Sequence, residues 1–351
     1  MNNSVSQELL KFLQKSPTAF HAVQQMKSEL LAVDFTELKE NQRWNIECGK
    51  HYFVTRNDSS LIAFTIPENG IDKMHILTSH SDSPTFKIKE NPEIEVEKHY
   101  VKLNVEKYGG MLCAPWFDRP LSVAGRVIIK DKTNGQFTSK LVNIDRDLVM
   151  IPNLAIHMNR EINSGYNYNA QKDLLPLYGC GSPKGTFMEQ IAEAAGGEKD
   201  EILGHDLFLY NRQEGSIWGA SEEFISSGRL DDLQCAFASL QGFLSGEKKD
   251  CMAVHCVLDN EEVGSGTKQG AASTFLFDTL IRVHEALGYD GEDYRVHLAD
   301  SFMISADNAH AVHPNYTEKA DPTNRPERRN RVEIQCKPEV LYGRRICCHV
   351  P

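Results

Sequence analysis

A mostly apolar, β-prone run at residues 251–258 ends abruptly in the carboxylates of Asp259, Glu261 and Glu262, and a glycine-containing turn follows. The run has the length of one buried strand. Open α/β sheets place their ligand chemistry at the carboxyl ends of such strands. The run therefore predicts an α/β domain with a functional site at this strand end, although an isolated Glu-Glu pair is more often a solvated acidic loop.

Two further β-prone runs end in polar residues of the same kind, the first in His80 and Asp82 and the second in Asp307. The acidic pair Asp231-Asp232 opens a run with helical spacing, where either residue has a simpler interpretation as a cap or a surface charge. Single histidines are likewise mostly structural. Together, one histidine and several carboxylates without cysteine indicate a divalent-metal hydrolase that uses Zn²⁺, Mn²⁺ or Co²⁺. In such sites two metals share a bridging carboxylate, and a Glu that binds no metal transfers the proton.

The pattern of predicted elements divides the chain into parts. Residues 1–90 and 225–326 alternate between strand-like and helical runs, whereas 91–224 holds short strand-like runs separated by turn residues. We interpret the first two ranges as parts of one catalytic α/β domain, with a central, mostly parallel sheet flanked by helices. The middle range is then an inserted β-rich domain, which a surface loop tolerates when its ends lie close together.

The same patterns predict individual elements. Helices are expected at 5–13, 19–31, 231–243 and 273–287, and strands at 52–55, 61–66, 73–80, 101–105, 122–129, 140–144, 251–258 and 301–306.

Composition limits the classes of partner and location. The net charge is −11 and no long Lys/Arg block occurs, which argues against nucleic acid and anionic membranes as partners. No signal peptide is visible, and no apolar run approaches membrane-spanning length. The nine cysteines are irregularly spaced, which is typical of reduced thiols. We therefore expect a cytoplasmic protein.

Seven motifs, in order along the chain, resemble those of the M18 metallopeptidases, and specifically the aspartyl aminopeptidases. They lie at 16–22, 79–89, 108–121, 151–157, 229–231, 259–265 (DNEEVGS) and 305–315 (SADNAHAVHPN). The resemblance implies an enzyme that removes N-terminal Asp or Glu from peptides. Such an enzyme uses two divalent metal ions, most often zinc, with manganese or cobalt as alternatives. It also implies a homo-oligomer, in which the inserted domain forms dimers and the dimers build a dodecamer.

The resemblance implies four metal ligands. His80 and Asp307 correspond to the terminal ligands, and Asp231 corresponds to the ligand that bridges the two metals. Glu262 corresponds to the ligand of the metal opposite Asp307.

Three other residues receive roles from the same resemblance. Glu261 corresponds to the general base, and Asp82 to the carboxylate that orients the metal-binding histidine. His157, on the inserted domain, corresponds to a residue that reaches the active site of the neighbouring subunit and stabilises the tetrahedral intermediate. Without the resemblance, His157 would be a structural histidine. His310 and His313 are expected to be supporting residues only.

After Pro326 the resemblance ends. Residues 327–351 read ERRNRVEIQCKPEVLYGRRICCHVP and lack the lysine-bearing strand and the last histidine ligand of the family. Codons can be chosen for this tail so that a frame shifted by one base gives LNGGIVWKFNANQKYCTDGESAAMF, which resembles the missing continuation. We interpret the tail as aberrant and frameshifted, with natural divergence as the alternative. His349 cannot be assumed to replace the lost ligand, so we expect this chain to be inactive, or nearly so, and prone to aggregate.

Two other functions remain open. One is another co-catalytic metallohydrolase, such as a broader aminopeptidase or an amide deacylase. The other is a non-catalytic assembly or binding subunit, which would have no need for His80, Asp231, Glu262 and Asp307 to hold metal.

Overall fold

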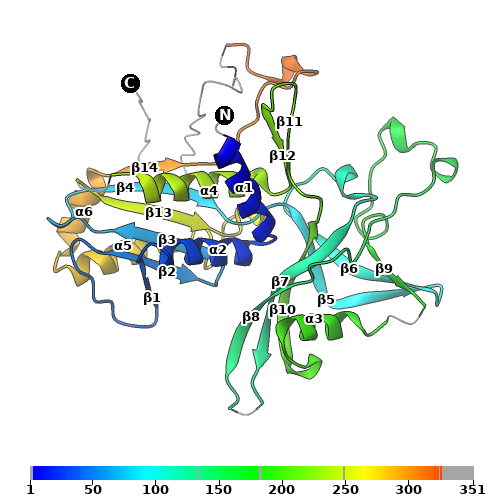
Figure 1. Cartoon of the computed structure of the whole chain (residues 1–351), viewed down its shortest axis with the longest axis horizontal. Helices are drawn as coiled ribbons and strands as arrows, with labels where there is room; N and C mark the ends of the chain where they lie inside the picture. Colours follow the sequence, from blue (N-terminus) through cyan, green and yellow to red (C-terminus); the bar gives the residue numbers. More distant parts are fainter. Residues whose placement is uncertain (1–2, 133, 182–183, 248–249, 324, 326–351) are drawn as a thin grey trace. The chain divides into compact units, whose positions relative to one another are not determined.

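The computed structural model describes residues 3–132, 134–181, 184–247, 250–323 and 325, so the aberrant tail predicted at 327–351 lies outside the described part. The chain forms two compact units (Figure 1). The first, here called the α/β unit, comprises residues 23–82 and the chain from 229 onward. The second, here called the β unit, comprises residues 1–22 and 83–228.

A six-stranded mixed sheet forms the centre of the α/β unit (Figure 1). Its strands, in spatial order, are β1 (Thr36–Leu38), β2 (His51–Arg56), β3 (Ser60–Thr65), β13 (Met252–Leu258), β4 (Met74–His80) and β14 (Phe302–Ser305). Three of the five neighbouring pairs are parallel, namely β1 with β2 and β4 with both β13 and β14. Strand β3 runs antiparallel to both of its neighbours. The mostly parallel sheet is therefore confirmed.

Helices cover both faces of this sheet, as β13 shows by the alternation of its side chains. Val254 and Cys256 belong to a buried apolar cluster with Phe275 of α5 (Phe275–Ala286). Between them, His255 points the other way and stacks on Phe243 of α4 (Leu230–Ser245), with 5.8 Å between ring centroids. The remaining helices of this unit are α6 (Gly291–Ala299), which the sequence pattern did not predict, and α2 (Ala19–Leu31) from residue 23 onward.

The β unit contains a second, antiparallel sheet of six strands. In spatial order they are β8 (Phe137–Asn143), β7 (Leu121–Lys130), β10 (Ile202–Asn211), β5 (Thr85–Val96), β6 (Tyr100–Tyr108) and β9 (Leu177–Cys180). The hairpin of β11 (Ser216–Trp218) and β12 (Phe224–Ser226), α1 (Asn3–Lys15) and α3 (Phe187–Ala195) complete it. The expectation of a β-rich unit omitted α3, whose buried residues Phe187 and Ile191 are one helical turn apart.

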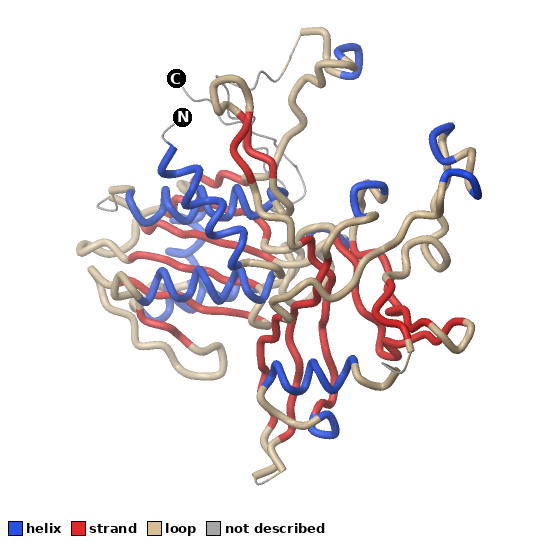
Figure 2. The backbone as a smooth tube through the Cα atoms, turned by 45° about the vertical axis from the view of Figure 1, so that its right-hand side comes forward, coloured by secondary structure: helices blue, strands red, loops and turns tan. Residues whose placement is uncertain are grey.

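Short 3-10 turns connect these elements. They are η1 (Ala114–Trp116), η2 (Ile156–Met158), η3 (Ile162–Ser164), η4 (Lys199–Glu201), η5 (Glu261–Val263) and η6 (Thr317–Lys319). Figure 2 shows that the strands of the α/β unit run between its helices. Because β4 pairs in parallel with both β13 and β14, the C-terminal ends of these three strands lie at the same end of the sheet. That end carries the site described next.

Candidate metal centre

His80 is the last residue of β4 and is buried, at 6% exposure. Its ring Nδ1 lies 3.2 Å from Oδ1 of Asp82, which is also buried. Because an ionised carboxylate only accepts hydrogen bonds, Nδ1 carries the hydrogen of this pair. The other ring nitrogen, Nε2, is then left with its lone pair toward the opposite side of the ring, where a metal ion would bind.

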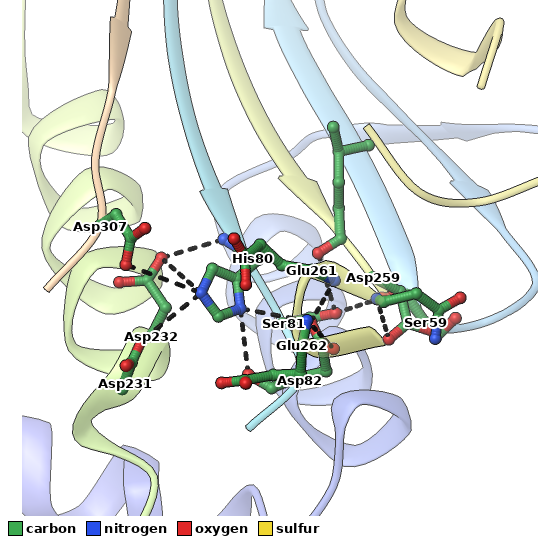
Figure 3. Close-up of polar contacts among 12 residues, drawn as sticks. Ser59, His80, Ser81, Asp82, Asp231, Asp232, Asp259, Glu261, Glu262 and Asp307 are labelled. Carbon is green, nitrogen blue, oxygen red and sulfur yellow. Dashed lines mark hydrogen bonds and ion pairs between the residues drawn. The ribbon is translucent and has the colours of Figure 1, made fainter. Parts of the chain in front are cut away.

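Three carboxylates face Nε2 of His80 from that side (Figure 3). Oδ1 of Asp231 lies 3.5 Å from Nε2, Oδ1 of Asp307 lies 3.9 Å away, and Oδ2 of Asp232 lies 4.0 Å away. Asp231 and Asp232 lie in the first turn of α4, where their backbone is not helical, and Asp307 is the second residue after β14. The parallel pairing of β14 with β4 brings Asp307 to the end of the strand that carries His80.

Asp232 is a residue that the sequence interpretation treated only as a cap or a surface charge. It is fully buried, and its Oδ2 accepts a hydrogen bond from the backbone N–H of His80 at 3.0 Å. Its Oδ1 has no hydrogen-bond partner among the residues that the structure describes. The peptide bond between Asp231 and Asp232 is cis. The only sequence signal for this role was the position of Asp232 directly after a predicted ligand.

Glu261 and Glu262 lie in η5, which begins three residues after the last residue of β13, at the same end of the sheet as His80. The backbone N–H of Glu261 donates to Oδ1 of Asp82 at 3.2 Å, and that of Glu262 donates to Oδ2 at 3.1 Å. The Asp82 carboxylate therefore binds the imidazole of His80 and the backbone of both glutamates. It fixes the distance between two parts of the site that are about 180 residues apart in sequence.

Burial, together with neighbouring negative charge, shifts the pKa values of the carboxylates in the centre. Burial and the charges of Asp231, Asp82 and Glu261 raise the pKa of Glu262 to about 7. Burial likewise raises the pKa of Asp232 to about 7. Burial and the nearby charge of Asp82 raise the pKa of Asp259 to about 7.

Within the described part of the chain, His80 is the one imidazole beside these carboxylates. Burial opposes a charged imidazole, but the neighbouring carboxylates of Asp231, Asp307 and Asp82 outweigh burial and raise the pKa of His80 far above its usual range. The carboxylates thus require a positive charge at Nε2, and a divalent cation in that position meets the requirement better than one proton.

The donor atoms also satisfy the geometry of metal binding. One group consists of His80, Asp231, Asp232 and Asp307, and a second consists of His80, Glu261 and Glu262. Within each group the donor atoms lie within 4.8 Å of one another. A nitrogen ligand with several carboxylates suits zinc and similar divalent ions. The residues present therefore fit a metal centre.

Comparison with known proteins agrees with this chemistry. A family model described as "Aminopeptidase I zinc metalloprotease (M18)" matches residues 12–344. The chain belongs to the M18 family of aminopeptidases. It is 48% identical over 335 residues to a probable M18 family aminopeptidase 2 of Clostridium novyi, covering 93% of this chain and 77% of that relative.

Solved M18-like structures share the fold. The Ape4 chain of a cryo-EM structure of the Ape4 and Nbr1 complex superposes with a TM-score of 0.87 at 35% identity, covering 92% of this chain and 67% of that chain. The S. cerevisiae mApe1 dodecamer gives a TM-score of 0.80 at 28% identity, covering 92% and 75%. The resemblance inferred from the motifs is thereby confirmed at the level of family and fold.

Other residues singled out by the M18 motifs do not belong to the candidate ligand groups. His157 is exposed on η2 of the β unit, and His310 and His313 are exposed in the loop after β14. None of the three joins a metal-capable group within the described part of the chain. The backbone N–H of Asn315 donates to Nδ1 of His313 at 3.1 Å, a contact within that loop.

None of the helices in the described ranges combines the length and hydropathy that a bilayer span requires.

Proposed function

We propose that this M18 chain is of the aspartyl aminopeptidase type and is built to hydrolyse N-terminal Asp or Glu from peptides. The observation that carries the proposal is the position of His80 between two sets of carboxylates. Asp82 binds Nδ1 on one side, and the carboxylates of Asp231 and Asp307 face Nε2 on the other. This arrangement, in a chain of a zinc aminopeptidase family, supports metal-assisted peptide hydrolysis.

In this proposal two divalent ions, zinc in the first instance, would bind at the C-terminal ends of β4, β13 and β14. His80 and Asp307 would be their terminal ligands, Asp231 the shared ligand and Glu262 the ligand of the second ion. Bound divalent ions supply Lewis-acid polarisation of the scissile carbonyl and a strong nucleophile near neutral pH. The proximity of these side chains in one unit supports the assignment.

Glu261 is the proposed general base. It takes a proton from the attacking water and delivers it to the leaving amine. Its backbone is fixed by Asp82, so its side chain starts from a defined position next to the ligand Glu262. Asp82 and Asp232 act through His80, since one binds its ring and the other its backbone N–H.

His157 is proposed to act in the active site of a neighbouring subunit, which requires a homo-oligomer. Its turn, η2, exposes Ile156 and Met158, and Leu154 just before it is also exposed. Exposed apolar residues of this kind are typical of a surface that a partner covers. The dodecameric mApe1 structure supports assembly of this chain into the same kind of oligomer. Size-exclusion chromatography with light scattering measures this directly.

We also propose a cytoplasmic location and a low activity for residues 1–351 as printed. The six cysteines in the described ranges are all free, as a reducing compartment favours. The low activity follows from the composition of the tail after Pro326, which carries no equivalent of the last ligand or of the lysine expected to pair with an acidic substrate side chain.

The test compares two proteins on the 4-nitroanilides of Asp, Glu and Leu. One is the 351-residue chain, and the other is the product of the frame in which residue 327 onward reads LNGGIVWKFNANQKYCTDG. The proposal predicts hydrolysis of the acidic substrates by the product of the other frame and little by the 351-residue chain. A preference for Leu would favour a broader aminopeptidase. Tight metal binding without hydrolysis by either would favour the assembly subunit.

A further inference from the structure

The loop that follows β13 closes on itself by short-range hydrogen bonds. The backbone N–H of Ser265 donates to the carbonyl of Asn260 at 2.7 Å, and that of Ala272 donates to the carbonyl of Ser265 at 3.3 Å. At Gly270 an added Cβ would stand 2.2 Å from the carbonyl oxygen of Ser265, so the close approach of these two segments requires glycine. The loop that carries Glu261 and Glu262 is therefore a folded unit of its own.

Asn260 stands at the point where β13 turns into η5. Its backbone is left-handed, with φ of +65°, a conformation that Asn tolerates better than most residues. Its side-chain Oδ1 accepts two hydrogen bonds, from Oγ1 of Thr267 at 2.8 Å and from Nε2 of Gln269 at 2.7 Å. The side chain that precedes Glu261 is thus tied to the far end of the loop.

Gln269 connects Asn260 to β3. Its backbone carbonyl accepts a hydrogen bond from Oγ of Ser60 at 2.8 Å, and the same Oγ accepts one from the N–H of Asp259 at 2.9 Å. The N–H of Asp259 also donates to the carbonyl of Gln269, at 3.4 Å. Gln269 is therefore anchored to β3 through its backbone carbonyl, while its side-chain amide holds Asn260.

We propose that Gln269 is a positioning residue, whose side-chain amide holds Asn260 so that Glu261 and Glu262 meet Asp82 in one fixed orientation. The Asn260–Gln269 latch, comprising Asn260, Thr267 and Gln269, holds the residue that directly precedes η5. The proposal rests on the proposed roles of Glu261 and Glu262 and adds a residue that their motif does not contain.

The physical argument is that the two hydrogen bonds accepted by Asp82 hold the backbone N–H groups of Glu261 and Glu262. With the latch intact, Asn260 before the turn is held as well, so the turn has less freedom to rotate. Without the latch, η5 loses one of its supports and the directions of the two glutamate side chains vary more. Loss of comparable supporting contacts at metal sites costs about 10–100-fold in metal affinity.

The test uses four single variants of the 351-residue chain and one double variant. Gln269→Met removes the side-chain hydrogen bond to Asn260 at nearly constant volume. Asn260→Gly removes the acceptor but keeps the left-handed backbone, and Asn260→Asp restores an acceptor. Gln241→Met is the matched control, because Nε2 of Gln241 donates to Oε2 of Glu29 at 3.1 Å, away from the loop.

Hydrogen exchange of the peptide at 259–266, measured without metal, is the first readout. We expect exchange about 10-fold faster in Gln269→Met and Asn260→Gly, no further increase when the two are combined, and near-normal exchange in Asn260→Asp and Gln241→Met. Unchanged exchange in both latch variants, or an equal increase in Gln241→Met, would overturn the proposal.

Calorimetric titration with Co²⁺ is the second readout, with about 10-fold weaker binding expected in Gln269→Met and normal binding in Gln241→Met. Equal affinity of Gln269→Met and the unmodified chain would also overturn the proposal. If the unmodified chain binds no Co²⁺, the metal site itself fails, and the exchange experiment alone decides whether the latch exists.

Discussion

The Asp82 carboxylate lies 3.2 Å from Nδ1 of His80 and thereby fixes which nitrogen of that ring faces the other carboxylates. With its hydrogen on Nδ1, the imidazole presents a lone pair at Nε2, and it is more basic because the neighbouring carboxylate stabilises positive charge. The same carboxylate receives the backbone N–H groups of Glu261 and Glu262. Asp82 therefore couples the imidazole of His80 to the loop that supplies the glutamates.

The first prediction concerns this coupling. Asp82→Asn retains one oxygen acceptor but loses the charge and the second oxygen, so it cannot hold the ring and both N–H groups together. We expect metal affinity to fall about 10–100-fold, as calorimetric titration with Zn²⁺ or Co²⁺ would show. Asp82→Ala should bind metal more weakly still. Unchanged affinity in both variants would mean that Asp82 has no part in the site.

The second prediction separates the two adjacent glutamates. Either is close enough to His80 to bind a metal, but only Glu262 is proposed as a ligand. Glu262→Gln should reduce the metal content, measured by mass spectrometry of the bound ions after dialysis. Glu261→Gln, its matched control, should retain the metal and, in any form of the chain that turns over substrate, lower kcat by about 10²–10⁴-fold. The reverse pattern would exchange the two roles.

The third prediction concerns the close approach within the loop. Gly270→Ala places a Cβ against the backbone of Ser265, whereas Gly266→Ala meets nothing nearer than 3.8 Å. The first change should lower the free energy of unfolding by about 1–3 kcal/mol, and the second should leave it nearly unchanged. Chemical denaturation of the two variants side by side provides the measurement. Equal stability would contradict the close packing of Ser265 on Gly270.

The sequence predicts those features of the fold that depend on residues close to one another in the chain. The strand ends at His80 and Asp307 were predictable, because a β-prone run followed by polar residues is a local pattern. The antiparallel direction of β3 was not predicted, since strand direction depends on partners rather than on the run itself. The helix α6 was missed because its apolar residues do not form a clear helical stripe, and only Tyr294 of that helix is buried.

The supporting contacts of the site were harder to predict than its ligands. Asp232 is polar and sits at a helix start, where exposure is usual, yet tertiary packing buries it against the N–H of His80. Gln269 acts through contacts with residues in two other segments, and no spacing rule encodes them. The sequence therefore identified the carboxylates and the imidazole, whereas the contacts that orient them required the structure.

The fourth prediction concerns acid stability. His255 is fully buried in β13, neither ring nitrogen has a hydrogen-bond partner in the described ranges, and burial lowers its pKa to about 3. Between about pH 6.5 and 3 the unfolded chain binds a proton at this residue and the folded chain does not. Its contribution to stability is therefore complete above about pH 6.5 and is lost as the pH falls toward 3.

His255→Leu removes this proton and keeps an apolar side chain against Phe243. The slope of unfolding free energy against pH should become shallower by up to about 1.4 kcal/mol per pH unit in that window, as urea denaturation at several pH values would show. Identical slopes in both proteins would mean that His255 finds a polar partner or water when it is charged.

The central claim is that the end of β4 is a divalent-metal site, and metal binding tests it most directly. The 351-residue chain, stripped with a chelator and titrated with Zn²⁺ in a calorimeter, should bind at least one ion with a dissociation constant in the micromolar range or below, about −8 kcal/mol or stronger. His80→Ala and Asp231→Ala should each abolish that binding while the circular dichroism spectrum is retained. Equal binding by the unmodified chain and both variants, or no binding by any of them, would contradict the account.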